Sequence, residues 1–378
     1  MTYKPKVYLT SSVFSVENIG SNNKINKKFR DSIAYLWQTL NKVSELKIFN
    51  GRFPTKELIL EAINNFKPNI VGCHLSHKIT SEMLNDSEIF AVATSTAGYN
   101  HIERTEKDDI LITHTPGVLQ ETVADYTIAI IMASLRNIID LHNYVWDGRW
   151  SPEDKWDLDQ NLSSVISNKI IGIIGLGEIG KEVVKRLYPW GLKIIYNDIK
   201  QINEFEKLYP RIDFRDKLED VFREADIISL HIPLNKSTER IISRDLLRIM
   251  KKDALLVNTA RGQILDLEAL LELLEREEIK INFALDVFPI EPIDAKTLDL
   301  IKKIKGEQPD IRMILIPHNA SADANTRGKM NIFFLSDIIK IIESSNIEDL
   351  RDIHLIPEHM EKLSEKEWKI INYWNKKK

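Results

Sequence analysis

Residues 170–180 read Ile-Ile-Gly-Ile-Ile-Gly-Leu-Gly-Glu-Ile-Gly, an apolar run that ends in the pattern G-x-G-x-x-G. A helical pattern follows directly, from Lys181 to Leu187. In a strand–turn–helix unit of this kind, Gly175 makes the tight turn, Gly177 lets the backbone approach a pyrophosphate, and Gly180 lets the helix pack on the strand. The helix N-terminus adds unpaired N–H groups and a positive dipole end, so this stretch predicts a dinucleotide-binding unit.

A second apolar strand and an acidic residue support this interpretation. Residues 193–196 read Lys-Ile-Ile-Tyr and lead to Asp198, which lies 18 residues after Gly180. A dinucleotide fold places a carboxylate there to accept hydrogen bonds from the adenosine ribose. The alternative is an ordinary strand-to-helix turn followed by an unrelated acidic residue. The strand, the glycines, the helix and Asp198 together favour the dinucleotide site.

Length and composition are those of a globular protein with more than one domain. The chain has 378 residues, of which 43% are hydrophobic and 29% charged, and its net charge is −4. A charge this small gives no field for a polyanion, so we expect no nucleic-acid partner. The N-terminus lacks the apolar core of a signal peptide, and the longest strongly apolar run, residues 126–135, is too short to cross a bilayer. We therefore expect a cytoplasmic protein that does not bind membranes.

The single cysteine, Cys73, excludes an intrachain disulfide and fits a reducing compartment. It lies beside His74 and close to His77, which are potential metal ligands. No second cysteine pair accompanies them, so we expect no metal site.

Strand and helix patterns alternate through the first hundred residues, which predicts a parallel sheet covered on both faces. The expected strands are 7–9, 69–72 and 89–93, and the expected helices are 56–65 and 80–84. After a turn at 114–117, residues 122–146 form one long, largely apolar helical pattern, which we expect to be buried in part against a second subunit. The tryptophans Trp146, Trp150 and Trp156 follow closely, and residues 150–168 read as a polar surface excursion. These features predict a homodimer.

Four further strands are expected after the glycine-rich turn, at 225–230, 254–258, 283–287 and 313–316. Each ends next to polar residues, which are His231, Thr259 to Arg261, Asp286 and His318. Ligands of open α/β sheets bind at the carboxyl ends of the strands, so these residues are expected to line one crevice.

The predicted fold is α/β, with two Rossmann-like, doubly wound parallel-sheet domains and a cleft between them. Residues 1–113 would form the first part of a substrate-binding domain, and residues 114–325 the dinucleotide-binding domain. Residues 326–378 would be a helical segment that returns to the first domain.

Arg261, Glu291 and His318 each follow a strand of the predicted dinucleotide sheet. An arginine can bind a carboxylate through two hydrogen bonds and polarise a neighbouring ketone. A histidine can exchange a proton near neutral pH, and a carboxylate beside it favours its protonated form. Each residue alone could be a solvated loop charge or a strand-end cap. Together beside a dinucleotide, they favour hydride transfer to a 2-oxo acid.

The order of these motifs resembles that of the D-isomer-specific 2-hydroxyacid dehydrogenases, over roughly residues 60 to 330. The matching segments are Thr96–Ile102, Thr115–Asp125, Gly175–Gly180, Leu230–Thr238, Asn258–Gly262, Asp286–Pro292 and Pro317–His318. Asn319 and Ala320 stand where the family usually has Ile-Gly, Asn168 replaces a common glycine, and residues 294–312 are longer than usual.

The resemblance implies an NAD-dependent oxidoreductase that interconverts a small 2-oxo acid and a D-2-hydroxy acid. Arg261 would bind and polarise the substrate, His318 would be the acid/base, and Glu291 would pair with His318. The backbone amides of Ala97 and Gly98 would hold the substrate carboxylate, with Ser76 nearby. The residues implied to bind NAD are Gly175, Gly177, Glu178, Ile179, Gly180, Asp198, Pro233, Thr238, Thr259 and Asp286.

The branch of the family remains open. Residues 74–80, His-Leu-Ser-His-Lys-Ile-Thr, are similar to a segment of glyoxylate/hydroxypyruvate reductases, whereas residues 287–292 are closer to phosphoglycerate dehydrogenases. Glu291 stands where the formate dehydrogenase branch has Gln, which disfavours that branch. An NAD-sensing, corepressor-like protein on the same fold is the alternative from another functional class, because such proteins can keep all three catalytic residues.

Overall fold

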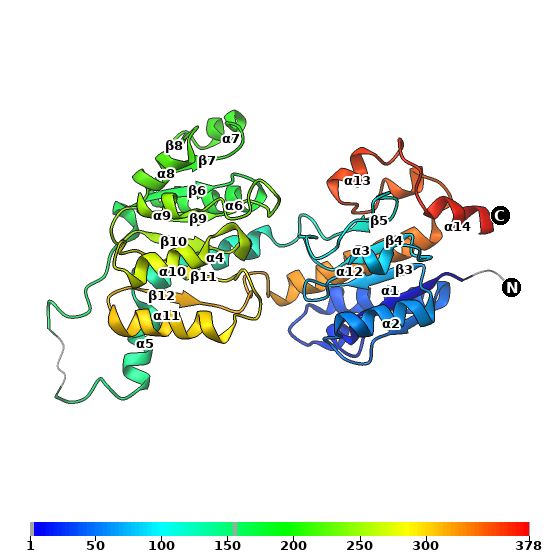
Figure 1. The fold of residues 1–378 in the computed structure, drawn as a ribbon, viewed down its shortest axis with the longest axis horizontal. Helices are drawn as coiled ribbons and strands as arrows, with labels where there is room; N and C mark the ends of the chain where they lie inside the picture. Colours follow the sequence, from blue (N-terminus) through cyan, green and yellow to red (C-terminus); the bar gives the residue numbers. More distant parts are fainter. Residues whose placement is uncertain (1–3, 154–156, 378) are drawn as a thin grey trace. The chain divides into compact units, whose positions relative to one another are not determined.

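The computed structural model describes residues 4–153 and 157–377. The chain forms two compact units, which we call unit 1 (Met1–Leu119 with Ala322–Lys378) and unit 2 (Gln120–Ser321). Each unit is an α/β structure around a sheet whose strands all pair in parallel (Figure 1). The predicted class of two parallel-sheet α/β domains is therefore confirmed.

Unit 2 contains a seven-stranded sheet in the order β12-β11-β10-β9-β6-β7-β8. Its strands are β6 (Ile170–Ile174), β7 (Lys193–Asn197), β8 (Ile212–Phe214), β9 (Ile227–Leu230), β10 (Leu255–Asn258), β11 (Asn282–Leu285) and β12 (Met313–Leu315). The chain winds from β6 to one side and then returns to β9 on the other. This reversal is the switch point beside which doubly wound sheets bind their ligands.

Helices cover both faces of this sheet (Figure 1). They are α4 (Gln120–Leu135), α5 (Ile138–Trp146), α6 (Glu178–Leu187), α7 (Asn203–Leu208), α8 (Leu218–Glu224), α9 (Arg244–Arg248), α10 (Leu267–Glu275) and α11 (Ala295–Glu307). Successive side chains of a strand point to opposite faces. Accordingly, Leu256 and Val257 of β10 belong to two different hydrophobic clusters. The sheet is thus buried on both sides.

The prediction of one continuous helix over residues 122–146 is wrong. The helix ends at Leu135 and a second one begins at Ile138, at an angle of 64° to the first. Asn137 between them has a left-handed backbone (φ 52°), a conformation that asparagine tolerates and that ends helices. The helix α4 buries Ile130 and Ile131 in the core, whereas no residue of α5 is buried.

No single helix among the described residues is long and apolar enough to cross a membrane. The bent pair α4 and α5 meets that test only when the two helices are taken together.

Unit 1 contains a five-stranded sheet in the order β2-β1-β3-β4-β5, another doubly wound arrangement. Its strands are β1 (Lys6–Leu9), β2 (Glu45–Ile48), β3 (Ile70–Cys73), β4 (Ala91–Thr94) and β5 (Leu111–Thr113). Its helices are α1 (Lys27–Val43), α2 (Lys56–Phe66), α3 (Ser81–Leu84), α12 (Ala324–Glu343), α13 (Pro357–Glu361) and α14 (Ile370–Lys377).

The C-terminal segment belongs to the core of unit 1. Trp368, Tyr373 and Trp374 are buried in the same hydrophobic cluster as Leu40 of α1, and Tyr373 stacks on Phe90. Residues 114–119 and 322–325, which the sequence pattern assigned to the dinucleotide domain, lie in unit 1.

Candidate functional site

The loops after β10, β11 and β12 carry the three residues proposed from the sequence to act in catalysis. These strands are neighbours in the sheet and run in the same direction, so their carboxyl ends share one edge. Arg261 follows β10, Glu291 lies in the loop after β11, and His318 follows β12. Strand pairing therefore gathers residues that are up to 57 positions apart in the chain.

Glu291 and His318 are joined by a short hydrogen bond. Nδ1 of His318 lies 2.7 Å from Oε2 of Glu291, and Oε1 of Glu291 accepts a hydrogen bond from the Phe288 amide at 3.0 Å. Burial opposes ionisation of Glu291. The hydrogen bonds from His318 and Phe288, with the charge of Arg261 nearby, nevertheless lower the pKa of its carboxyl. Glu291 is therefore an anion at neutral pH, and it orients the imidazole ring.

The backbone at His318 is held in an uncommon conformation. Its φ is 50°, in the left-handed region, which non-glycine residues rarely adopt. The carboxylate of the fully buried Asp286 accepts hydrogen bonds from the next two amides, Asn319 at 2.7 Å and Ala320 at 2.9 Å. Burial raises the pKa of Asp286, and these two hydrogen bonds oppose the rise. Asp286 therefore holds the turn that carries the histidine.

Arg261 is half-buried at the end of β10. The Asn258 side chain shapes its loop, since Asn258 Nδ2 donates to the Arg261 carbonyl at 2.9 Å and Oδ1 accepts from the Ala260 amide at 3.0 Å. Burial lowers the pKa of Arg261 and the charge of Glu291 opposes this, but an arginine stays protonated in proteins. The charge of Arg261 helps to lower the pKa of Glu291, and Glu291 contacts His318. The structure therefore brings the three residues together.

The glycines of residues 175–180 have the geometry that a dinucleotide site requires. Gly175 has φ +90°, and a Cβ there would lie 2.8 Å from the His231 carbonyl oxygen. A Cβ at Gly180 would lie 2.2 Å from the Gly175 oxygen, whereas one at Gly177 would meet no atom within 4 Å. Packing thus requires Gly175 and Gly180, while Gly177 leaves open space at the N-terminus of α6, where a pyrophosphate fits.

Asp198 lies at the end of β7, next to this turn. Its Oδ2 accepts a hydrogen bond from the Leu176 amide at 2.7 Å, which fixes the carboxylate beside the glycine-rich loop. Glu178 and Ile179 form the first turn of α6. The residue set of unit 2 therefore fits a dinucleotide.

The remaining residues proposed to bind the cofactor also follow strands of this sheet. Thr238 donates to the Pro233 carbonyl at 2.6 Å and closes the loop after β9. Thr259 follows β10 and bonds the Thr127 hydroxyl of α4 at 3.0 Å.

Ala97 and Gly98 lie in unit 1, in the loop after β4. The Ala97 carbonyl lies 2.8 Å from Nδ1 of His114, and the Gly98 carbonyl accepts from the Thr96 hydroxyl at 2.7 Å. Among the described residues, the Ala97 and Gly98 amides have no hydrogen-bond partner. Ser76 lies in the exposed loop after β3. The carbonyls of this turn are thus anchored while its two N–H groups stay available to an anion.

The side chains of Cys73 and His77 are engaged by other contacts than a metal site would need. Cys73 is buried and its pKa is raised to about 12 by burial. His77 is bonded through both ring nitrogens, to Thr10 at 2.7 Å and to the Arg52 carbonyl at 2.8 Å. Within residues 4–153 and 157–377, no group of three His, Cys, Asp or Glu side chains is arranged to hold a metal.

Sequence reasoning missed two residues that shape the site. Gly262 is required because a Cβ there would lie 1.9 Å from the Phe288 carbonyl carbon, so this glycine lets the Arg261 loop meet the Glu291 loop. Burial, together with the charge of nearby Asp286, raises the pKa of the Tyr126 hydroxyl of α4. The glycine directly after Arg261 was a readable signal, whereas nothing local to Tyr126 indicated its partners.

The fold and these strand-end residues are those of a dinucleotide-dependent oxidoreductase, and comparisons with known proteins specify its family. The family model of the D-isomer specific 2-hydroxyacid dehydrogenase NAD binding domain matches residues 128–320. The glyoxylate reductase of Thermofilum pendens is 33% identical over 293 residues, which are 77% of this chain and 82% of that protein. The glyoxylate reductase of Thermococcus litoralis is 31% identical, over 86% of this chain and 90% of that protein.

A crystal structure of a glyoxylate reductase from Paecilomyes thermophila has the same fold. Its TM-score is 0.73 at 22% sequence identity, and the match covers 94% of this chain and 99% of that one.

The chain belongs to the D-isomer-specific 2-hydroxyacid dehydrogenase family. It is an NAD-dependent oxidoreductase that transfers a hydride between the nicotinamide and a small 2-oxo or 2-hydroxy acid.

Proposed function

We propose that this protein reduces glyoxylate or hydroxypyruvate to the corresponding 2-hydroxy acid, with Arg261, Glu291 and His318 as its catalytic residues. The observation that carries the chemistry is the contact of 2.7 Å between His318 and Glu291, beside Arg261. The substrate class is taken from the curated relatives, which are named glyoxylate reductases. These names do not favour the corepressor-like alternative.

NAD(H), when bound, supplies or accepts the hydride. In unit 2, the open space at Gly177 would admit the pyrophosphate, and Asp198 would accept hydrogen bonds from the adenosine ribose. Glu178, Ile179, Pro233, Thr238 and Thr259 would line the cofactor, and Asp286 would bind the carboxamide. The fixed turn at Asp286 supports that role because its position is set by two backbone hydrogen bonds.

In reduction, the 2-carbon of the substrate gains a hydride and its 2-oxygen gains a proton. His318 supplies the proton from Nε2, because Glu291 engages Nδ1. The negative charge of Glu291 stabilises the imidazolium before the transfer. Arg261 binds the substrate carboxylate and polarises the ketone, so that negative charge developing on the oxygen is stabilised. Oxidation of the alcohol is the reverse, with neutral His318 as the base.

Unit 1 would be the substrate-binding domain. Its available amides at Ala97 and Gly98 would bind the substrate carboxylate, and Ser76 would contact the substrate. Residues 120–321 would be the cofactor domain.

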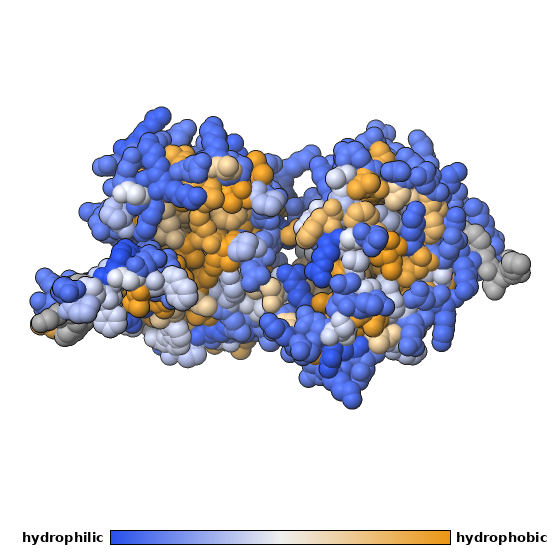
Figure 2. Space-filling view, turned by 90° about the horizontal axis from the view of Figure 1, so that it is seen from below, coloured by the Kyte–Doolittle hydropathy of each residue, from blue (hydrophilic) through white to orange (hydrophobic). Residues whose placement is uncertain are grey.

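We also propose a homodimer formed through α5 and the segment after it. Figure 2 shows hydrophobic residues that reach the drawn surface of unit 2 among hydrophilic ones. Among the described residues of α5 and the segment up to residue 165, the exposed large apolar side chains are Ile138, Ile139, Val145, Trp146, Trp150, Leu158, Leu162 and Val165. Trp156 lies outside the described residues. Many exposed apolar side chains along one segment support a protein interface, and closed two-fold dimers are the commonest assemblies. The single cysteine, which is buried and free, supports a cytoplasmic location.

The substrate is tested by following NADH consumption with a panel of 2-oxo acids: glyoxylate, hydroxypyruvate, pyruvate, 3-phosphohydroxypyruvate and bulkier acids. We expect the highest kcat/KM with glyoxylate or hydroxypyruvate, and a D-isomer where the product is chiral. A clear preference for 3-phosphohydroxypyruvate would instead place the protein with the phosphoglycerate dehydrogenases. NADH binding without turnover of any acid would contradict the proposal and favour a sensor.

A further inference from the structure

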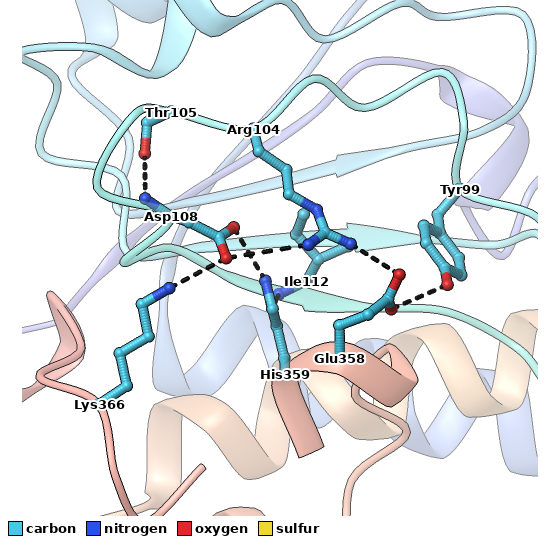
Figure 3. A network of polar contacts seen from close by, with 8 residues as sticks. All are labelled: Tyr99, Arg104, Thr105, Asp108, Ile112, Glu358, His359 and Lys366. Atoms are coloured by element: carbon cyan, nitrogen blue, oxygen red, sulfur yellow. Dashed lines mark hydrogen bonds and ion pairs between the residues drawn. The ribbon is translucent and has the colours of Figure 1, made fainter. Parts of the chain in front are cut away.

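The C-terminal segment of unit 1 contacts the same loop that carries Ala97 and Gly98, and nothing in the proposed chemistry uses it. The short helix α13 lies against the chain between β4 and β5 (Figure 3). Two of its side chains, Glu358 and His359, point toward that chain segment from adjacent positions. The C-terminal segment thus packs on the loop that carries Ala97 and Gly98.

Glu358 contacts two residues of this segment. The Tyr99 hydroxyl donates to Oε2 of Glu358 at 2.9 Å, and Oε1 lies 3.0 Å from Nη2 of Arg104. Burial, reinforced by the nearby Glu358 carboxylate, raises the pKa of Tyr99 to about 12, so the hydroxyl remains a donor at neutral pH. The Glu358 carboxylate therefore joins the loop residue Tyr99 to Arg104, further along the same segment.

A second set of contacts fixes α13 itself. His359 is buried, and its Nδ1 accepts from the Ile112 amide of β5 at 3.2 Å while its Nε2 lies 3.2 Å from Asp108. Lys366 also bonds Asp108, at 2.9 Å. An isolated surface ion pair contributes little, but a pair held on a fixed element loses less side-chain entropy when it forms. The helix that carries Glu358 is therefore itself bound to β5 and to Asp108.

Tyr99 in turn contacts the residue that anchors Ala97. Its ring meets the ring of His114 edge to face, at 5.4 Å between centroids and an interplanar angle of 85°. His114 is buried, and its Nδ1 bonds the Ala97 carbonyl at 2.8 Å. A continuous series of contacts thus runs from Glu358 through Tyr99 and His114 to the peptide between Ala97 and Gly98.

We propose that Glu358 is a positioning residue of the enzyme, which holds Tyr99 and thereby fixes the two amides at Ala97 and Gly98 for binding of the substrate carboxylate. This inference rests on the proposed role of those amides. It assigns a function to the C-terminal segment and predicts an effect on substrate binding from a residue that does not touch the substrate.

The test compares Glu358→Ala, Glu358→Gln, Tyr99→Phe and the double variant Tyr99→Phe/Glu358→Ala. The control is Glu361→Ala, a neighbouring exposed residue of α13. Amide hydrogen exchange is followed in peptides covering residues 96–101, and kcat and KM for glyoxylate are measured with saturating NADH. Thermal unfolding and the Kd for NADH are recorded for each variant.

We expect Glu358→Ala and Tyr99→Phe each to accelerate exchange in the loop and to raise KM by about tenfold, the size of one lost hydrogen bond to a charged group. kcat should change less than KM, and the Kd for NADH should stay constant. Glu358→Gln should keep loop exchange and KM close to the wild-type values, because the glutamine carbonyl can still accept the Tyr99 hydrogen bond. For exchange in the loop, the double variant should resemble Glu358→Ala, since each single change already removes the hydrogen bond between Tyr99 and Glu358. Glu361→Ala should behave like the wild type.

Unchanged exchange at residues 96–101 in Glu358→Ala would overturn the inference, whatever the kinetics. Additive effects in the double variant would also overturn it. Faster exchange with an unchanged KM would instead show that the loop does not bind the substrate, which contradicts the role proposed for Ala97 and Gly98. Failure of the oxidoreductase proposal itself would be seen in the wild type, which would then turn over no 2-oxo acid.

Discussion

The amide N–H of His318 donates a hydrogen bond to the carbonyl oxygen of Asp286 at 2.7 Å. The turn after β12 is therefore bound directly to the end of β11. The Asp286 carboxylate also accepts hydrogen bonds from the next two amides, so the backbone that carries the imidazole is held by the residue directly after β11. Glu291 then needs only to select the ring orientation and to stabilise the charge.

Replacing Glu291 with Gln should shift both pH–rate profiles toward lower pH. The lowered pKa of Glu291 keeps its carboxylate charged at neutral pH, and this charge favours the protonated imidazole. Without this charge the protonated form is less favoured, so reduction should fade and oxidation should begin at lower pH. Reduction at neutral pH should slow by roughly 100-fold or less. The test is to record the pH–rate profiles of reduction and oxidation for wild type and variant at saturating cofactor. Profiles that do not shift along the pH axis would show that Glu291 is not the charge partner of His318.

Arg261→Lys should lose most activity while the protein stays folded and still binds NADH. An ammonium group cannot reproduce the planar, two-bond contact of a guanidinium with a carboxylate. We expect kcat/KM to fall by about 100-fold or more, as when a donor that stabilises developing charge is removed. Steady-state kinetics and NADH fluorescence titration measure the two effects. Arg276→Lys, an exposed position of the same unit, is the control. A variant with wild-type turnover and KM would remove Arg261 from the substrate site.

Two alanine substitutions in the glycine-rich turn should separate binding from folding. A Cβ at Gly177 meets open space, so Gly177→Ala should keep the wild-type Tm but raise the Kd for NADH by at least about tenfold. A Cβ at Gly180 meets the Gly175 oxygen at 2.2 Å, so Gly180→Ala should lower stability by about 1–3 kcal/mol. Calorimetry and NADH titration of both variants check this. Equal effects of the two substitutions on Tm would contradict the described packing.

Wild-type protein should strongly prefer NADH to NADPH, and Asp198→Ser should reduce that preference. The Asp198 carboxylate is fixed beside the turn and would repel a 2′-phosphate, and like charges in contact cost several kcal/mol. The ratio of kcat/KM values for the two cofactors is the measurement. Asp245→Ser, an exposed residue of α9, should leave the ratio unchanged. Comparable values for both cofactors in the wild type would mean that Asp198 does not lie at the ribose.

Light scattering at micromolar concentration should give the mass of a dimer. Trp146→Lys should shift this mass toward the monomer, because the Trp146 side chain is 80% exposed on α5 and a charge there opposes burial in an interface. The control is Leu208→Lys, which replaces a similarly exposed apolar side chain on α7 (73% exposed) and should leave the mass unchanged. A monomeric wild type would refute the homodimer.

Much of the fold was predictable because its signals are local. The run Ile170–Ile174 and its glycines predict a strand and a turn without reference to any distant residue. The helix Lys27–Val43 was also readable but was not predicted, although Ile33, Leu36, Trp37 and Leu40 have helical spacing. The break at Asn137 could not be predicted, since asparagine occurs both inside helices and at the left-handed positions that end them.

The candidate site was also predictable only in part. Arg261, Glu291 and His318 were identifiable because each follows an apolar strand, and parallel pairing then brings strand ends together. The bond between Tyr99 and Glu358 joins residues 259 positions apart, and neither neighbourhood carries a pattern that indicates the other. Such pairs are set by how helices dock on a sheet, which only the folded chain determines.

The residues proposed to handle charge and proton all come from unit 2, an uninterrupted stretch of sequence, whereas the amides proposed to recognise the acid come from unit 1. Selection can therefore act on the two sets of residues separately. Mutations that reshape the loops of unit 1 can alter which acid is accepted while the ancestral proton chemistry passes on intact. A lineage that starts from one such gene can in this way diversify its substrates by small steps, none of which has to rebuild the catalytic residues.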